Sequence, residues 1–142
     1  MARTELEKLA DTNWVGTGEL WLDPNGDTAH RYECAMAISA NAISYTWSHE
    51  GKPHQGTVTI AARGATWSDS FHQPQTMECF DVPNAWGLFS LHYAYAAPGS
   101  PDWGWRTTLS HRPSGALVLQ MTNITPWGEE GRAVRMIFTR KG

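Results

Sequence analysis

Residues 42–62 read AISYTWSHEGKPHQGTVTIAA, and this stretch decides the fold. Its first half alternates side chains with a period of two, which is the pattern of a half-buried β-strand. One parity holds Ile43, Tyr45, Trp47 and His49, and the other holds Ser44, Thr46, Ser48 and Glu50. A second alternating run begins just past Gly51-Lys52-Pro53 and reaches about Ala62, so the two runs predict a β-hairpin.

The same pattern extends outward in both directions, with turn residues about every 8 to 14 positions between Asn13 and Arg140. Long sequential strands joined by short turns favour an up-and-down antiparallel barrel over a Greek-key sandwich, and closure removes exposed edges. We therefore predict an all-β, roughly ten-stranded barrel. The predicted strands cover residues 13–22, 28–38, 42–50, 54–62, 65–71, 75–82, 86–96, 103–111, 116–124 and 132–140.

The composition is that of one folded domain. The chain has 142 residues, of which 41% are hydrophobic and 18% charged, which predicts a single domain over residues 1–142 with a core of ordinary size. The formal net charge of -3 argues against a protein that coats nucleic acid. The apolar runs are far shorter than the ~20 residues needed to cross a bilayer, so we expect a soluble chain without membrane contact.

The N-terminal residues predict a short helix and a cytoplasmic location. Thr4-Glu5-Leu6-Glu7 matches a capping box, which favours a helix over roughly residues 5 to 10 that places Leu6 and Leu9 over one mouth of the barrel. The first ten residues, MARTELEKLA, lack the apolar region of a secretory signal, so we expect the chain to stay in the cytoplasm. In that compartment Cys34 and Cys79 are expected to be free thiols.

The more apolar parity of each strand predicts an interior lined by aromatic rings. Ten strands leave more room than the ~8 that their own side chains just fill, so we expect a ligand cavity. Gly16 and Gly18 share the inward parity, where they either vacate volume for large neighbours or allow a close backbone contact. The predicted lining comprises Trp14, Tyr32, Met36, Tyr45, Trp47, Trp67, Trp103, Trp105, Met121, Met136 and Phe138.

The segment Asp11–Leu20, with Trp14-Val15-Gly16-Thr17-Gly18, resembles the opening strand of the calycin families, whose pattern is Gly-x-Trp-x-Gly-x-Gly. Among these families, the chain is most similar to the ten-stranded nitrobindin-like and lipocalin-like bacterial domains. Thr12 stands where the family has its first Gly. The resemblance implies a lipophilic or aromatic ligand in the lumen. Nitrobindin-like proteins bind haem through a His close to the C-terminus, and because residues 132–140 contain no His, no haem cofactor is expected.

The segment from Trp67 to His72 carries the strongest chemical signal. Asp69 shares the parity of Trp67 and points into an aromatic interior, where desolvation raises the pKa of a carboxyl group unless donors compensate. Such a group is a candidate general acid or base, or an anchor for the polar end of a ligand. The alternative is that Asp69 and Ser70 form a turn or bulge that bonds its own backbone, with His72 in a loop.

Metal and nucleotide chemistry have little support in the sequence. The six His residues show none of the short spacings of a zinc site, although neighbouring strands can bring two or three of them together inside a barrel. His49 shares the parity of Trp47, and His111 that of Trp105. Neither a glycine-rich phosphate loop nor a Cys-x-x-Cys pair is present, so we expect no metal and no cofactor.

Two functions of different classes follow from the predicted interior. The first is binding of one small, mainly apolar or aromatic molecule, and the second is an enzyme of isomerase, lyase or hydratase type that uses an Asp or His of the lumen for proton transfer. A structural domain with a filled lumen is a third reading, and a homodimer is left open. The predicted ligand-binding residues are Tyr32, Tyr45, Trp47, His49, Trp67, Asp69, His72 and Trp105.

Overall fold

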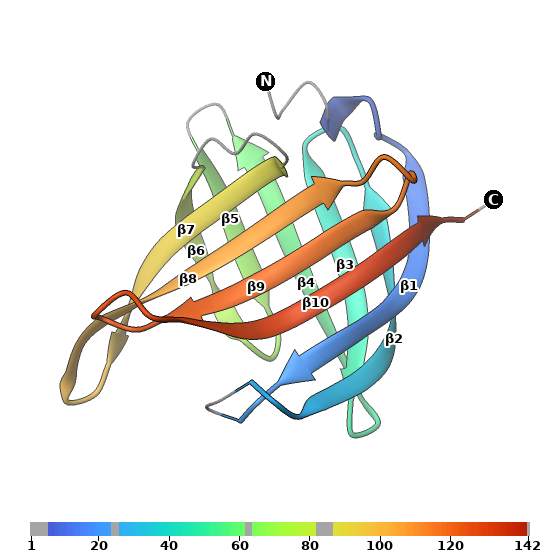
Figure 1. Cartoon of the computed structure of the whole chain (residues 1–142). Helices are drawn as coiled ribbons and strands as arrows, with labels where there is room; N and C mark the ends of the chain where they lie inside the picture. Colours follow the sequence, from blue (N-terminus) through green and yellow to red (C-terminus); the bar gives the residue numbers. More distant parts are fainter. Residues whose placement is uncertain (1–5, 24–25, 62–63, 82–86, 142) are drawn as a thin grey trace.

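A computed structural model describes residues 6–23, 26–61, 64–81 and 87–141 of the chain. Ten strands form one closed antiparallel barrel in which each strand pairs with its neighbours in sequence, and β1 closes the barrel against both β2 and β10 (Figure 1). The predicted all-β, ten-stranded up-and-down barrel is therefore confirmed. The strands are β1 (Thr12–Trp21), β2 (Ala29–Ile38), β3 (Ala42–His49), β4 (Lys52–Ala61), β5 (Gly64–Asp69), β6 (Gln73–Asp81), β7 (Gly87–Ala97), β8 (Ser100–His111), β9 (Leu117–Ile124) and β10 (Glu130–Arg140).

The hairpin of β3 and β4 shows how the local sequence sets the register. His49 pairs with Lys52 across the loop Glu50-Gly51, whose two residues have φ of 51° and 78°, as a type I′ turn requires. In a two-residue hairpin the pair beside the loop is the hydrogen-bonded one, so Pro53, one position further along β4, needs no N–H toward β3. The hairpin predicted from residues 42–62 is confirmed.

The inward parity of the strands forms one aromatic core. Of the eleven side chains predicted to line the interior, ten are buried and Trp103 is half-buried. A Cβ on Gly16 would lie 1.8 Å from the backbone oxygen of Ile137, whereas a Cβ on Gly18 would lie 2.3 Å from Cε1 of Tyr32. Gly16 therefore permits the close approach of the β1 and β10 backbones, and Gly18 leaves room for the Tyr32 ring. Both roles predicted for these glycines are observed, one at each position.

The predicted helix over residues 5 to 10 is not supported. Thr4 and Glu5, which belong to the proposed capping box, lie outside the described residues. Among the described residues only Leu6 and Glu7 have helical geometry, and residues 8–11 form turns, with backbone hydrogen bonds from Leu9 N–H to Leu6 O and from Ala10 N–H to Glu7 O. The chain then enters β1 through Asp11 at a φ of 64°. Leu6 and Leu9 are nevertheless buried in the core, so this segment covers the end of the barrel where β1 begins.

One further difference lies at a turn. Residues 97–102 separate two of the predicted strands as a loop, but Ala97 pairs with Ser100 around Pro98-Gly99, and the φ of 71° at Gly99 allows this tight turn. The strand predicted over residues 86–96 starts at Trp86, which lies outside the described residues. Within the described ranges, no helix has the length and apolar character that crossing a bilayer requires.

Candidate functional site

The turns that follow β1, β3, β5, β7 and β9 gather at the end of the barrel opposite the N-terminal segment, and we call this the open end (Figure 1). A partly enclosed pocket of about 580 Å³ lies there, which we call the mouth pocket. Hairpin ends that are far apart in sequence build its wall. The lining residues are Trp21, Leu22, Asp23, His72, Trp103, Trp105, Asn123, Thr125, Glu129, Glu130, Gly131, Arg132 and Ala133.

Beneath the mouth pocket, five rings contact one another in series and form what we call the aromatic belt. The ring centroids of Tyr32 and Trp47 are 5.2 Å apart, and Trp47 stacks on His72 at 5.5 Å with an interplanar angle of 17°. His72 lies 5.3 Å from Trp105, which stacks on Trp67 at 5.7 Å and 13°. Aromatic pairs prefer ring separations in this range. Because the five rings contact one another, side chains fill this part of the barrel interior. Two of its members, His72 and Trp105, line the mouth pocket.

Asp69, the last residue of β5, is buried with only 1% of its surface exposed, and its carboxylate accepts four hydrogen bonds. Oδ2 accepts from the Tyr45 hydroxyl at 2.7 Å and from Trp47 Nε1 at 3.2 Å. Oδ1 accepts from the backbone N–H groups of Phe71 at 2.8 Å and His72 at 3.0 Å. Asp69 thus both points inward and bonds its own turn. The carboxylate has no acceptor position left for a ligand, because the four protein donors already occupy the directions in which it accepts hydrogen bonds.

Tyr45 connects this carboxylate to the belt. Its hydroxyl accepts a hydrogen bond from Trp67 Nε1 at 3.0 Å while it donates to Asp69. Burial raises the pKa of Tyr45 well above its usual range, and the neighbouring Asp69 raises it further, so the phenol keeps its proton and remains a donor. The ring lies across Gly56 on β4, where a Cβ would come within 2.1 Å of Cζ of Tyr45. Because Gly56 has no side chain, it leaves the space that the Tyr45 ring occupies in this polar network.

Two side-chain groups around the belt have a buried polar atom without a hydrogen-bond partner among the described residues: Nε2 of His72 and the hydroxyl of Tyr32. Buried polar groups are normally hydrogen-bonded, so each of these atoms is costly unless something else reaches it. Burial lowers the pKa of His72 to about 4, which leaves the imidazole neutral at pH 7. A neutral ring nitrogen either donates or accepts, according to its tautomer. His72 therefore lines the mouth pocket as an uncharged residue, and its buried Nε2 has a hydrogen-bonding position that no described residue uses.

The barrel brings four histidines to the open end. His30 and His49 lie 5.4 Å apart, and His54 and His72 both pack against the ring of Trp47. Within the described part of the chain, no group of three or more His, Cys, Asp or Glu side chains is arranged to hold a metal ion. We conclude that these four histidine rings pack the open end of the barrel.

Both cysteines are free and buried. Burial raises the pKa of the Cys34 thiol to about 12 and that of Cys79 to about 11. A thiol reacts as the thiolate, so neither group is poised for nucleophilic or redox chemistry at neutral pH.

The structure brings all eight predicted site residues into one contact network. Five of them form the aromatic belt, Tyr45 and Asp69 join it through hydrogen bonds, and His49 joins the network through the ring of Phe71 at 5.6 Å. The prediction missed Trp21, Asn123 and Arg132, which line the pocket from the ends of three different strands. The signal that could have found them is topological, because in a meander every second turn lies at the same end of the barrel.

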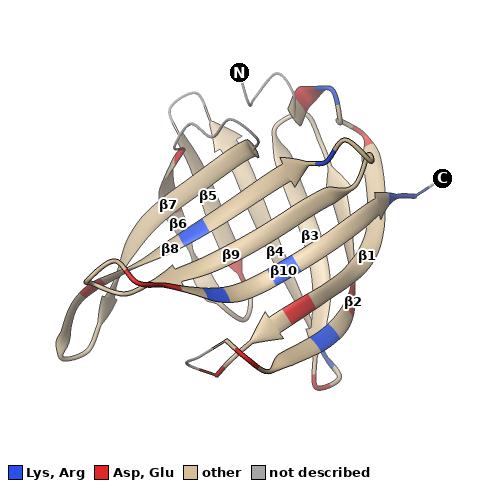
Figure 2. Cartoon of the chain, in the orientation of Figure 1, with Lys and Arg blue, Asp and Glu red and all other residues tan. Residues whose placement is uncertain are grey.

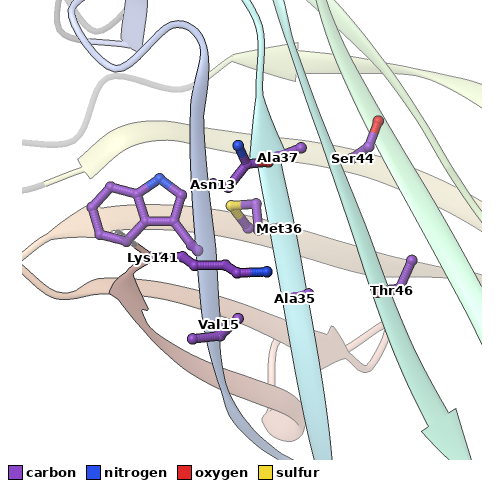
Figure 3. A pocket seen from close by; sticks show the side chains of 9 residues that line it. Asn13, Val15, Ala35, Met36, Ala37, Ser44, Thr46 and Lys141 are labelled. Carbon is purple, nitrogen blue, oxygen red and sulfur yellow. The ribbon is translucent and has the colours of Figure 1, made fainter.

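A second hollow, of about 650 Å³, lies on the outer face of β1, β2 and β3. Figure 3 shows Val15, Ala35 and Thr46 along it, with the side chain of Lys141 extended beside β1. These side chains belong to the outward parity, so the sheet separates this hollow from the aromatic belt. It is a shallow surface depression.

The fold and the mouth pocket together define a closed β-barrel with one covered end and one open end. Neither a scan against protein-family models nor a search of curated proteins finds a match to this chain. The function is therefore argued from the chemistry of the site.

Proposed function

We propose that the protein binds one small, mainly apolar and aromatic molecule in the mouth pocket, with the ligand resting on the aromatic belt. The observation that carries this proposal is a partly enclosed pocket whose inner wall combines Trp105 with the buried, unpartnered Nε2 of His72. Its volume of about 580 Å³ falls within the ~300–1,000 Å³ that is typical of small-molecule sites.

Affinity would come from apolar burial, at roughly 25 cal/mol per Å² removed from water, and orientation from the few polar groups. A ligand ring against Trp105 continues the stacked pair that Trp105 forms with Trp67. A polar atom of the ligand that bonds His72 removes an unsatisfied group, which is worth more than a hydrogen bond formed in competition with water.

The calycin-like relationship, the cytoplasmic location and the possibility of a homodimer remain parts of the proposal. The closed ten-stranded meander and the close approach of β1 to β10 at Gly16 are compatible with the calycin-like relationship. No observation on the described residues favours one oligomeric state.

Titration with aromatic compounds, monitored by tryptophan fluorescence, tests the proposal, with native mass spectrometry of the purified protein to detect a molecule that co-purifies. We expect Trp105→Phe to weaken binding about three- to tenfold, because the ligand loses part of its stacking surface. Trp14→Phe is the matched control, since Trp14 is equally a buried core indole but stands at the covered end beside His111. Equal affinities of both variants, or no binding by any compound, would contradict the proposal.

An enzyme that transfers a proton at this site would use a carboxylate paired with an imidazole beside the pocket, and the described residues do not form that pair. Asp69 accepts from the backbone N–H of His72, not from its ring. The remaining directions of the carboxylate serve Tyr45, Trp47 and Phe71.

A further inference from the structure

Building on the proposed function, we infer that the mouth pocket selects planar aromatic compounds that are uncharged and carry a hydroxyl, carbonyl or ring-nitrogen group, and that it discriminates against carboxylates of the same shape. The inference concerns which class of ligand the site accepts. Three independent features of the described residues support it.

The first feature is the absence of a buried cation. Every described Lys and Arg is exposed or half-buried, and none belongs to the aromatic core. The buried charge nearest to the inner wall is the carboxylate of Asp69, which is hydrogen-bonded to the backbone of His72 at 3.0 Å. A ligand carboxylate pushed against His72 would therefore be desolvated beside a like charge, with Arg132 held at the rim, which is unfavourable. A ligand ammonium group at the same place would also lose its hydration, and Asp69 would offer it no free acceptor because four protein donors already bond that carboxylate.

The second feature is the charge of the rim. Asp23, Glu129 and Glu130 line the pocket together with one arginine, Arg132. Figure 2 shows acidic positions in the turns after β1 and β9, at this end of the barrel. The guanidinium of Arg132 lies 4.4 Å above the ring of Trp21, and its Nε donates to the backbone oxygen of Gly26 at 2.7 Å. These contacts hold the cation at the rim. Glu130 is ion-paired with Arg106 at 2.5 Å, so three carboxylates stand against two guanidinium groups around the pocket, and the rim does not attract anions.

The third feature is the chemistry of the polar atom at the inner wall. Nε2 of His72 is buried and unpartnered, and the imidazole stacks on Trp47 and contacts Trp105 at a tilt of 39°, which together restrain its plane. A neutral imidazole bonds equally well to a hydroxyl, through its lone pair, and to a carbonyl, through its N–H. The surrounding indole rings favour a flat ligand, since a ring that stacks on Trp105 adds to the belt without moving it.

Isothermal titration calorimetry at pH 7 with four compounds of one shape tests the inference: biphenyl, biphenyl-4-ol, biphenyl-4-carboxylate and biphenyl-4-ylmethylammonium. We expect biphenyl-4-ol to bind about tenfold more tightly than biphenyl, which corresponds to one hydrogen bond to a buried, otherwise unsatisfied group. The carboxylate should bind at least about tenfold more weakly than biphenyl-4-ol. His72→Phe should bring biphenyl-4-ol to the affinity of biphenyl, whereas His111→Phe at the covered end should leave the ratio unchanged.

The outcomes separate the two levels of the proposal. If the carboxylate or the ammonium compound binds as tightly as biphenyl-4-ol, or if all four compounds bind equally, the inferred ligand class is wrong while the binding function stands. If none of the four binds, both are wrong. The comparison of four ligands on the unmodified protein is decisive even if His72→Phe does not fold.

Discussion

Replacing Asp69 by Asn tests the polar network under the candidate site. The carboxylate has two oxygens, and each accepts two hydrogen bonds, from Tyr45 and Trp47 on one side and from two backbone N–H groups on the other. An amide has one oxygen, so two of the four donors lose their acceptor whichever way the amide is turned. Hydrogen bonds to a charged group contribute about 1.5–3 kcal/mol each, so we expect the free energy of unfolding to fall by about 3–5 kcal/mol.

Equilibrium denaturation in urea at pH 7, followed by tryptophan fluorescence, measures this change as a shift of the midpoint at constant slope. Asp102→Asn is the matched control, because the side chain of Asp102 is exposed on β8 and its replacement should change the free energy of unfolding by less than ~0.5 kcal/mol. A loss below ~1 kcal/mol in Asp69→Asn would refute the reasoning, since it would mean that the four donors find other acceptors. Tyr45→Phe provides a milder second measurement, with an expected loss of about 1–2 kcal/mol.

Two further predictions concern packing and pH. Gly56→Ala should lower the free energy of unfolding by about 2–4 kcal/mol, because the new Cβ lies 2.1 Å from Cζ of Tyr45, whereas Gly104→Ala meets its nearest atom at 3.4 Å and should have little effect. Denaturation curves of both variants decide this, and equal losses would show that the Tyr45 ring moves aside freely. Burial lowers the pKa of His72 to about 4 against the opposing effect of Asp69, so between pH 6.5 and 4 the unfolded chain binds a proton that the folded chain does not. Stability should therefore decrease as the pH falls through this range, by roughly 2–3 kcal/mol, and His72→Phe should remove that part of the decrease; the same pH profile in both proteins would place the acid sensitivity at other groups.

The strands were predictable because alternation and turn chemistry agree along the whole chain. The run predicted over residues 42–50 is observed as Ala42–His49, and the loop Glu50-Gly51 fixes the register of the hairpin. That register already places Gly56 opposite Tyr45, so the space for the Tyr45 ring could also have been derived. The loop predicted over residues 97–102 is wrong in length, because the turn is confined to Pro98-Gly99 and β8 already begins at Ser100.

Strand parity could not predict the hydrogen-bond partners of Asp69. Its inward direction was predicted, but Tyr45 and Trp47 lie more than twenty positions away, and their approach depends on the pairing of β3, β4 and β5 together. Strand parity likewise predicts on which side of the sheet a ring lies. It does not predict how much cavity volume remains once the rings have packed. Most of the side chains predicted to line the interior are buried there, yet the mouth pocket lies at the end of the barrel.

The position of the pocket follows from how the interior satisfies its polar atoms. At the level of Asp69, every polar atom of the network with Tyr45 and Trp67 has a partner from within the protein, so this layer gains nothing from a ligand. Trp47 separates it from the next layer: its indole N–H bonds Asp69, while its ring contacts Tyr32 and His72, whose terminal polar atoms have no partner among the described residues. Native proteins rarely leave such atoms buried, and they do so chiefly where function requires it. Because His72 also lines the mouth pocket beside Trp105, the layer with unsatisfied polar atoms adjoins the open pocket, and this coincidence supports the proposed binding site independently of the pocket volume.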